Sequence, residues 1–275
     1  MAAHSEKMSQ DTSLKAVDPI WASLRAEAEY ALERDPILGA FLFSTILNHE
    51  SLEDCVVHRI CERLDHPDVQ AILLRQTFAE MRRDWPEWGE ILRVDIQAVY
   101  DRDPACTRFM EPVLYFKGFH AIQTHRLAHW LWNRGRRDLA LYLQSRSSSV
   151  FQTDINPAAK MGKGIFLDHA TGLVVGMTAT IGDDVSILQG VTLGGTGKET
   201  GDRHPKIGDS VLIGAGAKVL GNITIGKCSR IAAGSVVLKP VPPNSTVAGV
   251  PAKVVGTAGC SDPARAMDQL IISEE

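Results

Sequence analysis

Aliphatic side chains recur every six residues through much of the second half of the chain. The ten positions, all Val, Ile or Leu, are Val175, Ile181, Ile187, Leu193, Ile207, Ile213, Val219, Ile225, Ile231 and Val237. A period of six matches neither an α-helix, with about 3.6 residues per turn, nor a strand that alternates every two residues. It is typical of a coil of short parallel strands, in which one aliphatic residue on each side points into a central column.

Two interruptions break this period. An earlier run also steps by six: Ile155, Met161, Leu167 and Leu173. The register then shifts by two at Val175. A second break separates Leu193 from Ile207 by fourteen residues. The polar, glycine-rich segment 194–206 has no aliphatic residue for the column, so we expect it to leave the coil as a loop.

The first half of the chain has the pattern of helices instead. Asp18-Pro19 is a favourable helix start, because proline suits the first turn, and apolar residues follow at helical spacing. Further helices are predicted to begin at Pro36, Ser51, Pro67, Pro86, Pro112 and Arg136. The helix from Pro112 is predicted to be the longest and to stop at Gly135. Pro240, Pro242 and Pro243 are predicted to end the strand repeats.

These patterns predict four regions. They are a flexible tail over residues 1–17, an all-helical domain over 18–150, a coil of strands over 151–256 and a polar tail over 257–275. The apolar residues of the last region are Leu270, Ile271 and Ile272.

Composition narrows the classes of function. The chain is 44% hydrophobic and 23% charged, as in globular proteins, and its net charge of −4 gives no support for nucleic-acid binding. No run approaches the roughly 18 apolar residues of a membrane helix, and the polar start is unlike a secretion signal. Five cysteines without a CxxC pair favour reduced thiols. We therefore predict a cytoplasmic protein that binds neither membranes nor nucleic acids.

Two histidines, His169 and His204, are the only ones after residue 150. Both lie in polar interruptions of the repeat and not at column positions. Histidine is a suitable general base, because its ordinary pKa near 6.5 leaves it mostly neutral at cytosolic pH. By residue type alone, however, each histidine could equally be a solvated residue of a turn or loop.

Five segments of the sequence resemble those of a known protein family. They are "DIQAVYDRDPA" (95–105), "YFKGFHAIQTHRLAHWLWNRGRR" (115–137), "DHATGLVVG" (168–176), "LGGTGKETGDRHPKIG" (193–208) and "AGVPAKVVG" (248–256). Together they resemble the serine O-acetyltransferases, which are hexapeptide-repeat acyltransferases. The resemblance implies an N-terminal all-α domain and a C-terminal left-handed parallel β-helix. It also implies acetyl transfer from acetyl-CoA to the hydroxyl of L-serine, giving O-acetyl-L-serine and CoA, the first step of cysteine biosynthesis.

The resemblance also implies roles for particular residues. His169 would be the general base, oriented by the carboxylate of Asp154. Asp103 and Asp168 would take the ammonium group of the amino acid. Arg203 and His204 would help to hold serine and, in competition with it, cysteine. One coil with three hexads should take about eighteen residues. The fifteen residues from Asp154 to His169 are close to that length, which makes their contact plausible.

In the family, acetyl-CoA lies along a groove between coils of neighbouring subunits. We expect acetyl-CoA to contact Gly195, Thr196, Ala215, Ala233 and Lys253. The glycine-rich loop lacks the order of a phosphate-binding P-loop. No cysteine stands in an activating motif, which favours direct transfer without an acyl-enzyme.

The resemblance implies an assembly as well. Coils would form trimers, and helical domains would pair the trimers into a homohexamer. L-cysteine would act as a feedback inhibitor at the serine site. Family members often bind O-acetylserine sulfhydrylase through a C-terminal isoleucine. This sequence ends Ile271-Ile272-Ser273-Glu274-Glu275, without a terminal isoleucine, which argues against that complex.

Three other functions fit parts of the pattern. One is a related acetyltransferase that acts on a sugar or a similar hydroxyl. Another is a hydratase like the γ-class carbonic anhydrases, which needs three histidine zinc ligands where this region has two. The last is a purely structural, oligomer-forming module. His125 and His129 are spaced to share a helix face, but no third ligand is evident, so we predict a packed or surface pair and no metal.

Overall fold

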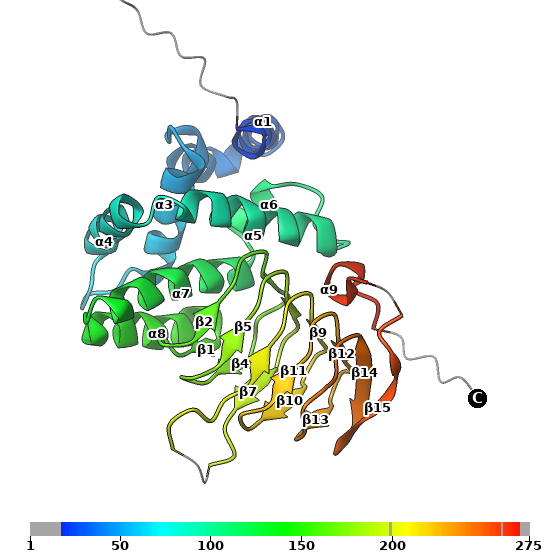
Figure 1. Ribbon diagram of the computed structural model, residues 1–275. Helices are drawn as coiled ribbons and strands as arrows, with labels where there is room; N and C mark the ends of the chain where they lie inside the picture. The colour runs from blue at the N-terminus through cyan, green and yellow to red at the C-terminus, as the bar shows by residue number, and fades with distance from the viewer. Residues whose placement is uncertain (1–17, 198–199, 260, 270–275) are drawn as a thin grey trace, which may run out of the picture.

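The computed structural model describes residues 18–197, 200–259 and 261–269 (Figure 1). Helical elements come first in the chain and strands follow. The helical elements are α1 (Pro19–Arg34), η1 (Pro36–Leu38), α2 (Gly39–Leu42), η2 (Phe43–Leu47), α3 (Leu52–Leu64), α4 (Ala71–Asp84), α5 (Trp88–Arg102), α6 (Met110–Leu114), α7 (Lys117–Asn133) and α8 (Arg137–Phe151). The predicted tail over residues 1–17 lies outside the described residues.

Local capping explains where several helices start. The Asp18 side chain accepts hydrogen bonds from the backbone N–H groups of Ile20 and Trp21 at the start of α1. The Ser51 hydroxyl accepts one from the Asp54 N–H at the start of α3. These contacts satisfy N–H groups that have no partner within the helix.

Two helix predictions are wrong in detail. The segment predicted as one helix from Pro112 is divided into α6 and α7, because the backbone at Phe116 is extended, with ψ at 107°. The helix predicted at Pro67 begins only at Ala71, because His66 and Val69 form an isolated β-bridge before it. The predicted stop at Gly135 is confirmed, and that glycine has a φ of +75°.

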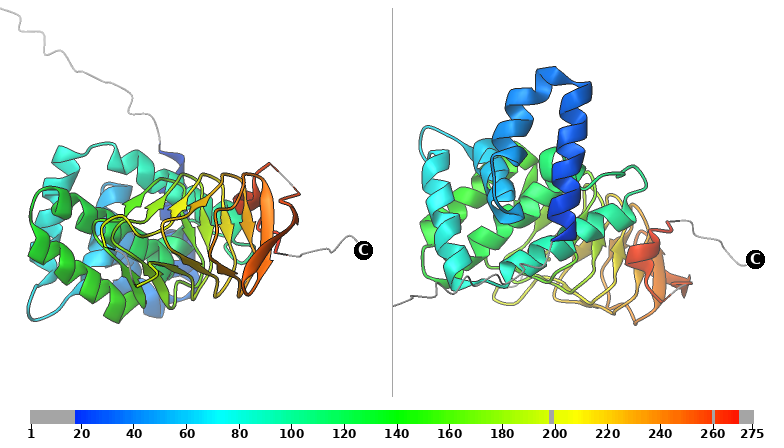
Figure 2. Two further views of the ribbon diagram at one scale, coloured as in Figure 1. Left: turned by 60° about the horizontal axis from the view of Figure 1, so that its bottom comes forward. Right: turned by 90° about the horizontal axis from the view of Figure 1, so that it is seen from above.

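The strands form a three-sided parallel solenoid (Figures 1 and 2). The first sheet contains β1 (Thr153–Ile155), β4 (Leu173–Val175), β7 (Thr192–Gly194), β10 (Lys218–Leu220) and β13 (Val236–Val237). The second contains β2 (Lys160–Met161), β5 (Thr180–Ile181), β8 (Lys206–Ile207) and β11 (Thr224–Ile225). The third contains β3 (Phe166–Leu167), β6 (Ser186–Ile187), β9 (Leu212–Ile213), β12 (Arg230–Ile231), β14 (Ser245–Gly249) and the antiparallel β15 (Ala252–Thr257).

The six-residue period corresponds to the central column. All ten aliphatic positions are buried, and none is more than 4% exposed. Neighbouring coils place them directly opposite one another, as Ile181 pairs with Ile207 and Ile187 with Ile213. The predicted architecture, a helical region followed by a parallel β-helix, is therefore confirmed.

The register also shows where the period fails. Phe166 pairs with Ser186, twenty residues on, whereas Val174 pairs with Thr192, eighteen on. The two additional residues therefore lie in the turn 168–172. Further along, Thr180 pairs with Lys206, twenty-six residues on, which places eight additional residues in the loop 195–205.

Two edges of the solenoid matter for the site. Corner 3/1, where the third sheet turns into the first, consists of the turns 168–172, 188–191, 214–217 and 232–235. Corner 1/2, where the first sheet turns into the second, includes the turns 156–159, 176–179, 195–205 and 221–223. The described parts of the loop 195–205, which are 195–197 and 200–205, project from the solenoid away from the helices (Figure 1).

The prolines at 240–243 do not end the repeats, contrary to the prediction. They occupy a turn, after which β14 pairs in parallel with β12, and Val247 lies opposite Ile231. Val247 is 2% exposed, so it extends the column by one more position. Proline is tolerated here because the turn needs no ladder hydrogen bond.

The helical region packs directly onto the solenoid, with one continuous hydrophobic core. The buried Asp95 of α5 accepts hydrogen bonds from the Arg126 side chain and, through its other oxygen, from the Ile165 N–H. Arg102 donates to the Gly164 carbonyl and to Ser186. These polar contacts fix α5 and α7 against the turn before β3.

The last described segment folds back onto the helices. α9 (Pro263–Ala266) lies beside α5, where Arg265 forms a 3.0 Å ion pair with Asp101. The Ala264 carbonyl accepts a hydrogen bond from the Ser186 hydroxyl. The residues Ile271 and Ile272, which bear on the predicted sulfhydrylase contact, lie outside the described residues.

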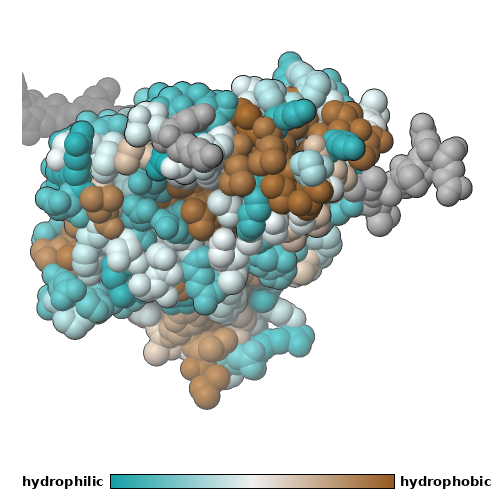
Figure 3. Space-filling view, turned by 90° about the horizontal axis from the view of Figure 1, so that it is seen from below, coloured by the Kyte–Doolittle hydropathy of each residue, from teal (hydrophilic) through white to brown (hydrophobic). Residues whose placement is uncertain are grey.

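Apolar side chains are exposed at both ends of the molecule. At the helical end, α1 and the following segment project from the body (Figure 2, right) and expose Tyr30, Ile37 and Phe43. Apolar residues also gather on the face seen in Figure 3, toward the end where the chain leaves the solenoid. The exposed apolar residues of the last coils are Leu238, Val250, Val254 and Val255. Within the part of the chain described, no helix is long and apolar enough to cross a bilayer.

Candidate active site

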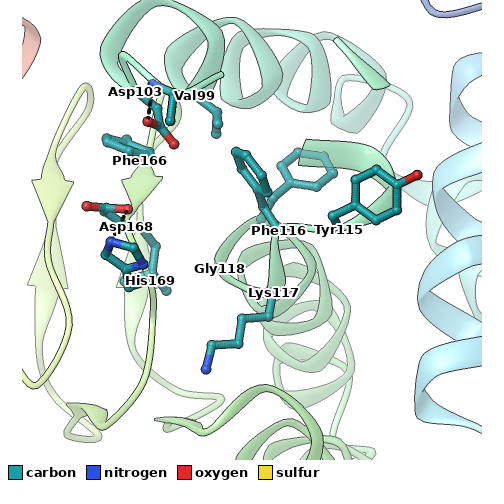
Figure 4. Close-up of a pocket in the computed structure, with 12 residues that line it drawn as sticks. Val99, Asp103, Tyr115, Phe116, Lys117, Gly118, Phe166, Asp168 and His169 are labelled. Atoms are coloured by element: carbon teal, nitrogen blue, oxygen red, sulfur yellow. Dashed lines mark hydrogen bonds and ion pairs between the residues drawn. The ribbon is translucent and has the colours of Figure 1, made fainter. Parts of the chain in front are cut away.

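A cavity of about 440 Å³ lies at corner 3/1, between the solenoid and the helices (Figure 4). Its walls come from the end of α5, the start of α7 and β3 with its following turn. It is lined by Val99, Asp103, Ala105, Tyr115, Phe116, Lys117, Gly118, Phe119, Phe166, Leu167, Asp168 and His169. The cavity thus combines aromatic walls with two carboxylates, a lysine and a histidine.

The turn 168–172 presents His169. Its two additional residues widen the corner, and His169 and Ala170 both adopt positive φ values, +54° and +62°. Ala170 is fully buried, whereas the His169 side chain is 74% exposed. Its Nε2 lies 3.7 Å from Oδ1 of Asp168. The turn therefore points an accessible imidazole outward beside a carboxylate.

Two carboxylates face the same cavity. Asp103 caps the end of α5, and its Oδ1 accepts a hydrogen bond from the Ala105 N–H at 2.9 Å. Burial raises the pKa of Asp168, and the negative charge of Asp103 raises it further, while His169 opposes both effects. The charge of Asp103 disfavours ionisation of Asp168, so a bound cation would stabilise the ionised form of Asp168.

Asp154 lies on the first strand of the solenoid. It lies on β1 opposite Val174, and its Oδ1 accepts a 2.5 Å hydrogen bond from Gln144 Nε2. A coil takes twenty residues here, so Asp154 aligns with the strand after the His169 turn. This coil is two residues longer than the expected eighteen, so the fifteen residues from Asp154 to His169 are five short of it. The orienting role of Asp154 remains a prediction.

Arg203 and His204 lie at corner 1/2. His204 is 6% exposed, and its Nδ1 accepts a hydrogen bond from the Thr178 N–H at 3.2 Å. The ring covers Gly176, where a Cβ atom would collide with it. Burial lowers the pKa of His204, and the nearby positive charges of Arg203 and Lys206 lower it further. The imidazole is therefore held neutral and in a fixed orientation.

A single chain does not bring all the predicted residues together. Asp103, Asp168 and His169 share the cavity at corner 3/1. Arg203 and His204 line a separate hollow with Met177 and Thr178 at corner 1/2. The first sheet, represented by β4, lies between these two corners.

The residues predicted to bind acetyl-CoA are also divided between corner 3/1 and corner 1/2. Ala215 and Ala233 lie on corner 3/1, in the same stack of turns as His169. These turns are joined by hydrogen bonds of 2.8 Å from the N–H groups of Gly190, Gly216 and Gly234 to the carbonyls of Thr171, Gln189 and Ala215. Gly195 and Thr196 lie on corner 1/2, and Lys253 is exposed on β15.

Sequence reasoning missed nine of the twelve residues that line the cavity, and three of these lie together around the start of α7. Phe116 and Lys117 line the cavity at the start of α7. Gly118 lets that helix touch the solenoid, since a Cβ there would collide with the carbonyl oxygen of Leu167. The local signal that could have found them is the run Phe116-Lys117-Gly118 within the segment 115–137.

His125 and His129 form a packed pair, as predicted. His125 Nε2 donates to the Ala159 carbonyl at 3.2 Å, and His129 Nδ1 donates to the Pro157 carbonyl at 2.8 Å. Both rings thus help to join α7 to the first coil. Among the described residues, no cluster of three or more His, Cys, Asp or Glu side chains could hold a metal ion.

Known proteins support the architecture and its motifs. The family model "Serine acetyltransferase, N-terminal" matches residues 20–124, and "Bacterial transferase hexapeptide (six repeats)" matches 204–239. A serine acetyltransferase of Salmonella typhimurium is 53% identical over 250 residues, covering 91% of this chain and 92% of that protein. One of Escherichia coli is 51% identical over 257 residues, covering 94% of each.

Solved structures agree with these relatives. A serine acetyltransferase from Brucella abortus in complex with coenzyme A is 72% identical, with a TM-score of 0.88 over 89% of this chain and 98% of that one. A serine acetyltransferase in complex with cysteine is 51% identical, with a TM-score of 0.90 over 92% of this chain and 98% of that one. The chain therefore belongs to the serine acetyltransferase family.

Proposed function

We propose that this protein transfers the acetyl group of acetyl-CoA to the hydroxyl of L-serine, giving O-acetyl-L-serine and CoA. The observation that carries the proposal is the cavity at corner 3/1, where Asp103 and Asp168 face the same space as the exposed His169. Its relatives support the same reaction, since they are named serine acetyltransferases and two solved ones hold coenzyme A and cysteine.

The negative charges of the cavity suit the ammonium group of serine. The paired carboxylates of Asp103 and Asp168 bind the ammonium group, which offsets the raised pKa of Asp168. Arg203, from corner 1/2, binds the carboxylate through two hydrogen bonds. These contacts leave the serine hydroxyl beside His169.

The chemistry is a direct transfer. His169 takes the hydroxyl proton as the serine oxygen attacks the thioester carbonyl. The carbon–sulfur bond then breaks, and the imidazolium returns the proton to the departing sulfur, giving the CoA thiol. Cys106 packs behind the cavity wall, where burial raises its pKa to about 12, so it is not an available thiolate nucleophile.

Acetyl-CoA lies along corner 3/1 in this proposal. The small side chains of Ala215 and Ala233 let the pantetheine arm approach the backbone of the stacked turns, and Lys253 lies at the far end of the same edge. Gly195 and Thr196 come from corner 1/2 and line the opposite side of the groove. The transferred acetyl group then lies near His169.

The division of the site between two corners supports a cyclic assembly. If corner 1/2 of one subunit meets corner 3/1 of the next, each interface completes one site. A trimer, which the family resemblance implies, would close such a ring. The exposed apolar residues of α1 and its following segment support pairing of two trimers into a hexamer. Cysteine as a feedback inhibitor and a cytoplasmic location remain predictions.

Subunit mixing tests the reaction and the assembly together. His169→Ala and His204→Ala should each abolish or strongly reduce acetylation of L-serine, measured as release of CoA thiol. Co-expression of the two variants should restore about a quarter of the wild-type activity, because some interfaces then combine two intact halves. Mixing either variant with itself is the control. Failure to restore activity would show that both halves come from one chain.

A further inference from the structure

The turn that carries His169 holds an unfavourable backbone conformation. At the regular turns of corner 3/1 the positive φ falls on glycine, at Gly190, Gly216 and Gly234. In the turn 168–172, two consecutive residues with side chains, His169 and Ala170, adopt positive φ. This left-handed conformation brings Cβ close to the following carbonyl oxygen, so it persists only where the surroundings hold it.

Contacts from two helices hold this turn. Lys117 Nζ, at the start of α7, donates a hydrogen bond to Thr171 Oγ1 at 2.5 Å. It also donates to Gln152 Oε1 at 2.8 Å, at the end of α8. The Thr171 hydroxyl donates to the same Gln152 oxygen at 3.1 Å, and the Gln152 carbonyl accepts from the Gly172 N–H at 2.8 Å. Three side chains thus close a network beside His169.

The position of Lys117 itself is fixed. The next residue, Gly118, lies against the Leu167 carbonyl, so the start of α7 cannot shift without losing contact with β3. The Lys117 side chain lines the cavity and runs from α7 along the wall opposite His169 (Figure 4). Its ammonium group has two acceptors within the protein, so its effect on the reaction passes through them.

We propose that Lys117 is a positioning residue, which holds the strained turn through Thr171 and Gln152 and so fixes the placement of His169. This inference rests on the proposed function, in which His169 is the general base. Without the ammonium group, the turn should relax and the imidazole should spend less time in the reactive position. Turnover should therefore fall, whereas CoA should bind normally, because Ala215 and Ala233 lie on other turns.

A double-mutant cycle tests this coupling. Lys117→Met and Thr171→Val should each lower kcat at least tenfold, with the dissociation constant of CoA changed less than twofold. The double variant should be no more than about twofold slower than the slower single variant, because both changes break one network. Thr171→Ser keeps the hydroxyl and should retain most of the activity. Lys227→Met changes an exposed lysine at another corner and should leave kcat unchanged.

Hydrogen exchange provides a readout that does not depend on catalysis. The Gly172 amide should exchange at least tenfold faster in Lys117→Met than in the wild-type protein, while amides of the central column stay protected. The proposal is overturned if the two single effects multiply in the double variant, or if Lys117→Met keeps both its kcat and its Gly172 protection. If wild-type protein fails to acetylate serine, the proposed function fails, and the exchange rates still decide whether Lys117 holds the turn.

Discussion

The buried ion pair between Asp95 and Arg126 should dominate the stability of the junction between helices and solenoid. Their side chains are 0% and 3% exposed, and Asp95 Oδ2 accepts from Arg126 at 2.6 and 2.9 Å. Asp95→Ala would leave the Arg126 charge buried without its partner and remove the acceptor of the Ile165 N–H. Loss of one member of such a pair costs about 3–5 kcal/mol. We expect the free energy of unfolding to fall by about that amount.

Urea denaturation followed by circular dichroism measures this effect at fixed protein concentration. Asp84→Ala is the matched control, because Asp84 and Arg134 form a 2.7 Å pair with half-exposed side chains. That change should cost about 1 kcal/mol or less. Asp95→Leu combined with Arg126→Met removes both charges and should be less damaging than Asp95→Ala alone. Equal, small losses in Asp95→Ala and Asp84→Ala would refute the reasoning.

Further predictions concern the helix contact, acid stability and the edge of corner 3/1. Gly118→Ala should displace α7 from β3 and lower both the unfolding midpoint and kcat, whereas Gly135→Ala, in open space, should affect only stability. Burial lowers the pKa of His125 to about 3. Because the unfolded chain binds this proton near pH 6.5 and the folded protein does not, stability should fall by about 2 kcal/mol between pH 7 and pH 5. His125→Gln should flatten that part of the pH profile, and an unchanged slope would contradict the assignment. Ala233→Trp should weaken CoA binding at least tenfold in calorimetry without unfolding the coil, and unchanged affinity would place the CoA groove elsewhere.

The sequence predicts the solenoid well because its information is local. Each inward position must be aliphatic to fill a narrow column, so a fixed period identifies the coil without knowledge of any distant contact. The same logic locates the site, since His169 and His204 lie in the segments where the period fails. The structure moves the first shift from Val175 back into the turn 168–172, where two additional residues form the His169 turn.

The sequence could not predict contacts between residues that are far apart in the chain. Lys117 and Thr171 are far apart in the chain, and their hydrogen bond depends on how α7 lies on β3. The coil from Asp154 to Val174 is two residues longer than three hexads, because coil length depends on the size of each corner. The break between α6 and α7 lies at the extended residue Phe116, two residues before Gly118 contacts the solenoid.

Acetyl transfer by a His169 variant tests the central claim most directly. Wild-type protein and His169→Ala would be compared in a thioester-consumption assay with acetyl-CoA and L-serine, and CoA binding would be measured by calorimetry on the same samples. The account predicts that serine-dependent turnover is lost in His169→Ala, while CoA affinity and the circular dichroism spectrum are retained. Turnover close to that of the wild-type protein would contradict it.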